Sequence, residues 1–356
     1  MSHPRRKTLR DVALRAGVST ATASHALNNT RSVGKAARQQ VLDAAKALGY
    51  QPNFLARSLK MGSSRLIGCL VNSLSNPFIS AAVEGAHTVL RNQGYGLLVY
   101  RTGPQGSGVT DGVRFAESYH AAGLLVVHPR VSESRALRRW AAAHQPLVLA
   151  IHRDPTLAAD TVTMAHEEAG YDATRYLLEQ GHRRIAVLSR PTRLEVYALI
   201  TAGYHRALRD QGIEPQRALL RCDERTTLPD AQQELGYREM LALLALPKTP
   251  TAILCSHNQI AIGALRALRE RGLNVPKQIS LMTFDHVDWM RVTEPALTSI
   301  GVHGDPLGQA AAHALLDRLA GAADPPRIIH LPMELAVRDS VAPPQARRRA
   351  KTPTVG

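Results

Sequence analysis

A stretch of short side chains, GVSTATASHALNNT at residues 17–30, contains the residue types that contact DNA bases. Alanine and the threonine methyl group can touch the methyl group of thymine, and serine and threonine hydroxyls can bond bases or phosphates. His25, the only bulky polar side chain of the segment, can donate a hydrogen bond to guanine. A slim helix of this kind could lie deep in the major groove, but the same composition also suits a helix packed against another protein.

The distribution of charge favours the first of these interpretations. The chain has 356 residues and a net charge of +15, of which residues 1–65 carry +10 from 12 Lys or Arg and two Asp. Residues 341–356 carry a further +4, so the sequence between is close to neutral. A basic head on a near-neutral body is typical of a nucleic-acid-binding module, although a solvated basic arm would have the same charge.

Three short helices are needed to position this segment, and the head has the pattern for them. Thr8 and Asp11 form a T-x-x-D capping pattern before an amphipathic helix, and Gly17 suits the positive φ that ends it. Ser19 then caps a second helix, and a third is predicted over about 35–48. Two helices joined by a tight glycine turn, with a third packed on them, predict a helix-turn-helix.

The next segment predicts a hinge. Leu55 and Leu59 are spaced i, i+4 between Pro52 and a Gly-Ser-Ser exit. A helix this short is marginal alone in water, so it is either an ordinary linker helix or one that folds only on DNA.

From Leu66 onward, short apolar runs alternate with helical segments, which predicts parallel sheets with helices on both faces. Ligands of such sheets bind beyond the carboxyl ends of the strands. That rule nominates the residues just after each run, among them Ser75, His128, Asp154 and His257. Seven of the set are the candidates for a small-molecule site: Asn76, Phe78, Arg101, Arg153, Arg193, Asn258 and Asp285.

Other signals of chemistry are weak. The Gly-rich segment 103–112 lacks the Lys-Ser/Thr of a P-loop, and the 15 histidines show no metal-ligand spacing. No nucleophile-base-acid set stands out. We therefore expect no bound metal and no cofactor, and we do not expect the protein to be an enzyme.

Two of the three cysteines lie in apolar runs, and neither a secretion signal nor a membrane-length apolar run is present, which indicates a cytoplasmic protein. The rival class is a solute-binding or enzymatic α/β protein with an incidental basic arm.

Two long segments, TLRDVALRAGVSTATASHALNNTRSV and LGYQPNFLARSLKMGSSRLIG, resemble the LacI/GalR family of bacterial repressors. The head is most similar to the purine-repressor branch of that family. NPF at 76–78, EQGHRRIAVLS at 179–189 and AIGALRALRERGLNVPKQIS at 261–280 extend the resemblance over about residues 8–340. It implies a homodimer that binds a palindromic DNA operator with a central CpG step and is controlled by a small-molecule effector.

The resemblance also assigns DNA contacts. Thr20, Ala21, Thr22 and His25 would contact bases, with Arg31 in support, and Leu59 would wedge into the minor groove at the CpG step. The DNA-binding candidates are Thr8, Thr20, Ala21, Thr22, Ser24, His25, Asn28, Arg31, Leu55, Leu59 and Lys60.

The implied architecture is a three-helix helix-turn-helix head at 1–51, a hinge helix and linker at 52–65, and an α/β periplasmic-binding-protein-like core at 66–340. The core would consist of two doubly wound parallel-sheet subdomains, the first over about 66–160 and 291–322, the second over about 161–290 and 323–340. A basic disordered tail would occupy 341–356, and its lack of leucine heptads predicts a dimer rather than a tetramer.

The predicted ligand site departs from the family pattern. Ile200 stands where an arginine often contacts the effector, and the residues that hold a purine base in the family are not matched around 194–196. Ala122 and Asn258 stand where the family usually has acidic residues. A purine effector is therefore not expected. Asp285 could bind the paired hydroxyls of a sugar or an amine, whereas the arginines would favour an anion, so the identity of the effector stays open.

Overall fold

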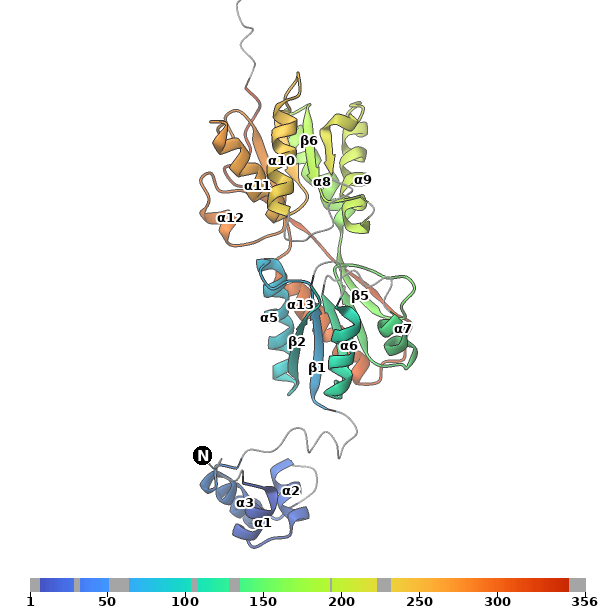
Figure 1. Cartoon of the computed structure of the whole chain (residues 1–356), viewed down its shortest axis with the longest axis vertical. Helices are drawn as coiled ribbons and strands as arrows, with labels where there is room; N and C mark the ends of the chain where they lie inside the picture. Colours follow the sequence, from blue (N-terminus) through green and yellow to red (C-terminus); the bar gives the residue numbers. More distant parts are fainter. Residues whose placement is uncertain are drawn as a thin grey trace, which may run out of the picture. The chain divides into compact units, whose positions relative to one another are not determined.

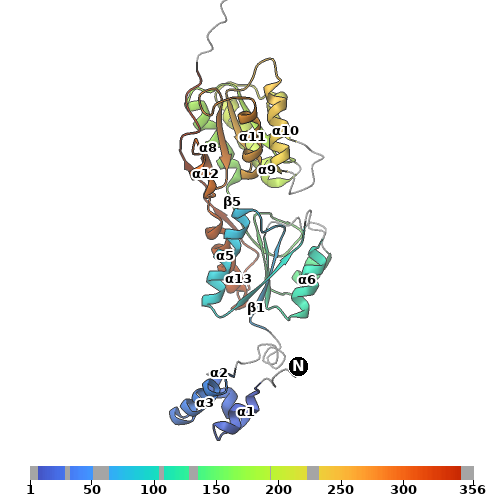
Figure 2. The same cartoon turned by 60° about the vertical axis from the view of Figure 1, so that its left-hand side comes forward.

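The fold is described from a computed structural model of the chain (Figures 1 and 2). The described residues are 7–28, 33–50, 64–103, 108–127, 135–192, 194–222 and 232–345. Two compact units are present, residues 1–64 and 65–356, which we call the head and the core. Five candidate residues lie outside the described residues: Arg31, Leu55, Leu59, Lys60 and Arg193.

The head contains three helices, α1 (Leu9–Arg15), α2 (Thr20–Asn28) and α3 (Lys35–Ala47). The predicted capping box is present, because Asp11 Oδ2 accepts from the Thr8 backbone N–H at 2.8 Å and Thr8 Oγ1 accepts from the Asp11 backbone N–H at 3.4 Å. Gly17 has the left-handed φ of 65° that ends α1. Local signals in the sequence therefore set the boundaries of the helix-turn-helix.

A small apolar core joins the three helices. Its buried residues are Val12, Ala13, Ala23, Ala26, Val41, Ala44 and Ala45. Alanine dominates this set, so the helices can approach closely, and α2 packs through its two buried alanines and the partly buried Leu27. The rest of the α2 surface stays available for contacts outside the head.

The first sheet of the core has parallel strands with helices on both faces (Figure 1). In sheet order its strands are β11 (Ile328–Leu331), β5 (Asp160–Met164), β4 (Leu147–Ala150), β3 (Gly123–Val127), β1 (Leu66–Val71) and β2 (Gly96–Arg101). Helices α5 (Pro77–Asn92) and α13 (Gly304–Leu319) pack together on one face, and α6 (Val109–Ser118) and α7 (Arg135–Ala142) cover the other. Burial on both faces explains why the central strands are continuous apolar runs.

The second sheet repeats this winding. In sheet order its strands are β12 (Glu334–Ala336), β10 (Thr298–Gly301), β9 (Ser280–Phe284), β8 (Ala252–Cys255), β6 (Ile185–Ser189) and β7 (Leu220–Cys222). Its helices are α8 (His166–Glu179) packed on α9 (Glu195–Asp210), α10 (Gln232–Leu244) packed on α11 (Asn258–Glu270), and the short α12 (Trp289–Val292). Strand β12 pairs antiparallel with β10, whereas the other pairs are parallel. Two doubly wound sheets are thus present, as the sequence predicts.

The chain passes between the two sheets after β5, after β10 and after β11, near residues 165, 302 and 332. The family resemblance predicts these crossings earlier, near 160, 290 and 322. Residues 161–164 and 328–331 therefore belong to the first sheet and 298–301 to the second, the reverse of the expected assignment. The cause is that these strands are short and mix polar with apolar residues, so no apolar run marks them.

The ordered core also extends into the segment expected to be a disordered tail. Ser280 Oγ donates to the Ala342 carbonyl at 3.0 Å and accepts from the Ala342 N–H at 3.1 Å. His182 Nε2 lies 3.0 Å from the same carbonyl. Residues 346–356, with the tail's basic residues, lie outside the described part of the chain.

Candidate functional site

Helix α2 has one buried and one exposed face. Ala23 and Ala26 are buried against the other two helices of the head. The candidates for base contact lie elsewhere on the helix: Thr20 and Ala21 are exposed, and Thr22, Ser24 and His25 are partly exposed. Asn28 is the last residue of the helix, and the first turn contains no acidic side chain. The positive end of the helix dipole is therefore not opposed there by a carboxylate.

Two of the DNA-contact candidates also stabilise helix ends. Thr8 caps α1. At the start of α2, the Ser19 hydroxyl accepts from the Thr22 N–H at 3.0 Å, and Thr22 Oγ1 lies 2.9 Å from the same hydroxyl oxygen. A hydroxyl has one donor and two acceptor positions, so a capping threonine can still bond a phosphate.

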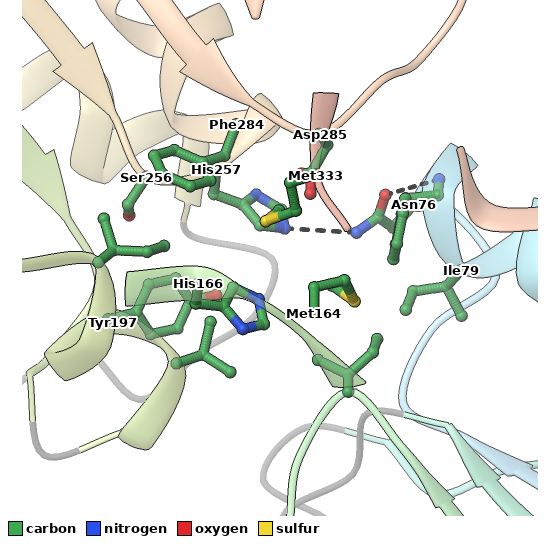
Figure 3. A pocket seen from close by; sticks show the side chains of 14 residues that line it. Asn76, Ile79, Met164, His166, Tyr197, Ser256, His257, Phe284, Asp285 and Met333 are labelled. Atoms are coloured by element: carbon green, nitrogen blue, oxygen red, sulfur yellow. Dashed lines mark hydrogen bonds between the residues drawn. The ribbon is translucent and has the colours of Figure 1, made fainter. Parts of the chain in front are cut away.

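A pocket with a volume of about 30 Å³ lies in the core, where the strands of both sheets end (Figure 3). Its lining residues are Asn76, Phe78, Ile79, Ile151, Met164, His166, Val196, Tyr197, Ile200, Ser256, His257, Phe284, Asp285 and Met333. Among these described lining residues there is no lysine or arginine, and most are apolar or aromatic. Such a lining with a few polar groups is typical of a small-molecule site.

The first sheet contributes Asn76, which follows β1 and begins α5, and the second contributes His257, which follows β8 and begins α11. Asn76 Oδ1 accepts from the Phe78 N–H at 3.0 Å. His257 Nδ1 accepts from the Gln259 N–H at 3.2 Å. The two side chains point toward one another in Figure 3, with Asn76 Nδ2 at 3.4 Å from His257 Nε2. This contact joins the two sides of the pocket.

Asp285 is the carboxylate of the pocket. Asn258 Nδ2 donates to its Oδ2 at 2.7 Å, and burial raises the pKa of Asp285 although the Asn258 hydrogen bonds oppose that effect. Its backbone is left-handed with φ of 73°, and a Cβ on Gly301 would lie 2.7 Å from the Asp285 Cα. The glycine therefore makes room for the turn that presents this carboxylate.

Two more polar side chains of the lining are buried. His166 Nδ1 and Ser256 Oγ have no hydrogen-bond partner among the described residues. Burial lowers the pKa of His166 to about 4, and the charge of Asp285 only partly opposes this. His166 is thus neutral at physiological pH, with hydrogen-bonding capacity left for a ligand.

Only some of the predicted effector residues come together. Asn76, Phe78 and Asp285 line the pocket, and Asn258 supports Asp285 from behind the lining. Arg101 and Arg153 are exposed and do not line it, and Arg193 lies outside the described residues.

Other lining residues were not nominated from the sequence. Met164 and Met333 stand at the ends of β5 and β11, so the strand-end rule would have found them if those strands had been recognised. His257, by contrast, follows an apolar run and is nominated by the strand-end rule together with Asn258, and it lines the pocket. Val196 and Ile200, at the positions where the sequence departs from the family pattern, place apolar side chains in the pocket.

The described residues contain no group of three or more His, Cys, Asp or Glu side chains placed to hold a metal ion. None of the described helices is both long and apolar enough to span a membrane.

Known proteins match the chain along most of its length. Residues 8–53 match the family described as bacterial regulatory proteins, lacI family, and residues 174–341 match the periplasmic binding protein-like domain. The HTH-type transcriptional repressor CytR of Escherichia coli K12 is 33% identical over 316 residues, which cover 88% of this chain and 90% of CytR. The repressor PurR of Escherichia coli O139:H28 is 34% identical over 337 residues, which cover 94% and 97%.

Solved structures agree with these relatives. The lac repressor dimer bound to operator and the anti-inducer ONPF has a TM-score of 0.82 and 28% identity, and the match covers 95% of this chain and 100% of that one. The complex of the transcriptional regulator CelR with cellobiose has a TM-score of 0.69 and 26% identity, with 94% and 100% covered. The relatives are regulators rather than enzymes. With its helix-turn-helix head and effector-binding core, the chain belongs to the LacI/GalR family of bacterial transcriptional repressors.

Proposed function

We propose that this repressor acts in the cytoplasm as a homodimer that binds a palindromic operator with a central CpG step. The observation that carries the proposal is the exposed face of α2, whose small side chains allow a close approach to base edges. Thr20, Ala21 and His25 contact bases, and Leu59 enters the minor groove at the CpG step. A dimer presents two copies of α2, which is why the operator has two matching halves.

The effector binds in the core pocket and acts through the two sheets. The lining comes from both of them, with Asn76 and Met164 on one side and His257 and Asp285 on the other. A ligand that contacts both sides favours one arrangement of the sheets over another. Because β1 directly follows the hinge at 52–65, such a shift reaches the DNA-binding head, and DNA and effector affinities become coupled.

The pocket favours an effector without negative charge. An anion would meet the buried carboxylate of Asp285 and no cationic side chain among the described lining residues. The buried guanidinium of Arg190 is not part of the lining and donates to the Tyr197 hydroxyl at 3.3 Å. Arg101 and Arg153, which would have favoured an anion, are exposed outside the lining. A molecule with hydroxyl or amine donors fits this composition better than a carboxylate or a phosphate.

Selection of genomic DNA fragments by the purified protein, at near-physiological salt and followed by sequencing, tests the operator proposal. We expect a short palindrome with CG at its centre. Affinity for that site should fall steeply with ionic strength, because phosphate contacts release counterions. Binding without sequence preference, both in buffer and with cell extract added as a source of corepressor, would contradict the proposal.

A further inference from the structure

The two sides of the pocket meet through side chains that cap two helices. Asn76 Oδ1 is occupied by the N–H of Phe78 in α5, and His257 Nδ1 is occupied by the N–H of Gln259 in α11. The remaining nitrogens, Asn76 Nδ2 and His257 Nε2, face each other at 3.4 Å (Figure 3). The chemistry of this contact depends on where the imidazole carries its proton.

His257 cannot accept a hydrogen bond at both ring nitrogens. A neutral imidazole has one acceptor and one N–H, and an imidazolium has no acceptor. The ring is neutral, because burial and then the charge of Arg190 lower the pKa of His257 to about 3. The Gln259 amide is the closer of the two donors and lies in the first helical turn, where an N–H has no partner within the helix. Nδ1 is therefore the acceptor, and Nε2 carries the proton.

A hydrogen bond to the backbone likewise fixes the orientation of the Asn76 side-chain amide. Its carbonyl oxygen accepts from the Phe78 N–H, so its NH2 group is the part that faces His257. Two donors thus meet at 3.4 Å. An oxygen beside the line that joins the two nitrogens can lie about 2.9 Å from both of them and accept a hydrogen bond from each.

We propose that Asn76 Nδ2 and His257 Nε2–H form a donor pair that holds one acceptor oxygen of the effector, a carbonyl, ether or hydroxyl oxygen, and so links the two sides of the pocket. This rests on the proposed function, since it takes the pocket to be the effector site. His166 Nδ1 and Ser256 Oγ give independent support, because both belong to buried lining residues, 4% and 3% exposed, and lack a partner among the described residues.

The donor pair explains how a ligand could change the core. Two donors that face each other without an acceptor lose the hydrogen bonds that each would make in water. An inserted oxygen replaces that unfavourable contact with two hydrogen bonds, one to each sheet. The ligand therefore stabilises the arrangement in which α5 and α11 begin close together.

The first test is the tautomer of His257 in the full-length protein. Two-bond ¹H–¹⁵N correlation spectra of protein labelled with ¹⁵N-histidine at neutral pH distinguish the two neutral tautomers. The signals of His257 are assigned by their loss in His257→Ser, which keeps a capping hydroxyl for α11. If that variant fails to fold, His257→Thr serves the same purpose. We expect the Nε2–H tautomer, and the Nδ1–H tautomer would overturn the proposal.

The second test supplies the acceptor within the chain. Asn76→Asp keeps the oxygen that caps α5 and replaces the NH2 group with a second oxygen. In the wild-type background this oxygen accepts from His257, so Asn76→Asp should raise the melting temperature by roughly 2–4 °C more than it does in the His257→Ser background. The interaction of the new carboxylate with the helix dipole and with Asp285 is common to both backgrounds and cancels.

A zero or negative difference would overturn the proposal, because Nε2 would then not donate to the new oxygen. A positive difference supports the proposal only together with the Nε2–H tautomer in the unsubstituted protein, because a neutral imidazole can move its proton to meet a new carboxylate. Both tests use the protein without DNA. Operator binding by the same variants is measured separately, so a protein that binds no operator is distinguished from one whose donor pair is wrong.

Discussion

His25 is the residue on which sequence-specific binding by α2 should depend most. It is partly exposed among small side chains, and it can donate to a guanine base edge where the alanines cannot. His25→Ala should therefore reduce discrimination at one base pair of each half-site by about 1–3 kcal/mol. Non-specific affinity should change little, because phosphate contacts supply it. Competition binding with operators altered at single positions measures the effect.

The matched control is His313→Ala, which removes an exposed histidine from α13 of the core. It should leave the base preference unchanged. A uniform loss of affinity across all operators in His25→Ala would show that His25 contacts the backbone instead of a base.

At the residue scale, the ligand site could be predicted only in part. Asn76 and Asp285 were found because they follow apolar strands that the sequence shows clearly. Arg101 satisfies the same rule, but β2 is an edge strand, so its end is remote from the lining. The meeting of Asn76 with His257 joins residues 181 positions apart, which no local pattern encodes.

Among the secondary-structure elements, β5 is held by an ion-pair network that the sequence does not show. Asp160 Oδ1 accepts from Arg318 Nη2 of α13 at 2.6 Å and from the N–H of Arg327, just before β11, at 2.8 Å. The Asp160 side chain is fully buried. Removing the charge leaves two arginines facing a neutral group, so Asp160→Asn should reduce the free energy of unfolding by about 3 kcal/mol in urea denaturation at neutral pH.

The stabilisation by the charged Asp160 side chain should decrease as the pH falls. Burial raises the pKa of Asp160, but the hydrogen bonds and charges of Arg318 and Arg327 outweigh it and leave the pKa below 3.8. The stabilisation is therefore present above the ordinary aspartate pKa and is lost as the pH falls through the lowered value. The control is Asp172→Asn. The Asp172 carboxylate lies 3.1 Å from the Arg175 guanidinium on the surface of α8, and removing this ion pair should reduce the free energy of unfolding by less than ~1 kcal/mol. Equal losses of unfolding free energy in Asp160→Asn and Asp172→Asn, or a difference between the two losses that does not shrink in acid, would contradict this account.

The elements themselves differ in how well their sequences reveal them. The buried strands β1, β3 and β8 are continuous apolar runs, and helices α1 and α2 have side-chain caps at Thr8 and Ser19, so the sequence predicts these elements. Strands β10 and β12 have four and three residues and take their place by pairing with each other and with β9. Their sheet is decided by partners distant in sequence, which is why two of the three crossings were placed about ten residues too early.

For the molecule as a whole, a basic head and a near-neutral core divide the work of DNA binding and ligand binding. The charge of +10 in residues 1–65 predicts general attraction to DNA, whereas the small side chains of α2 predict preference among sequences. In the proposed function, the core responds to a ligand because both sheets contribute to one pocket. We propose that the hinge at 52–65 connects ligand binding with DNA binding, so a variant there should separate specific from non-specific DNA binding.

Leu59→Ala makes that separation testable. If Leu59 wedges between bases at the central CpG step, its removal sacrifices contacts that exist only on the kinked operator. Specific affinity should then fall roughly 10-fold or more, while affinity for random DNA, which depends on phosphate contacts, stays nearly constant. Fluorescence anisotropy with operator and scrambled duplexes at equal salt compares the two, and Met61→Ala controls for loss of an apolar side chain in the same segment. An equal loss on both duplexes would mean that Leu59 stabilises the hinge itself, since only a contact confined to the kinked step can weaken one complex and spare the other.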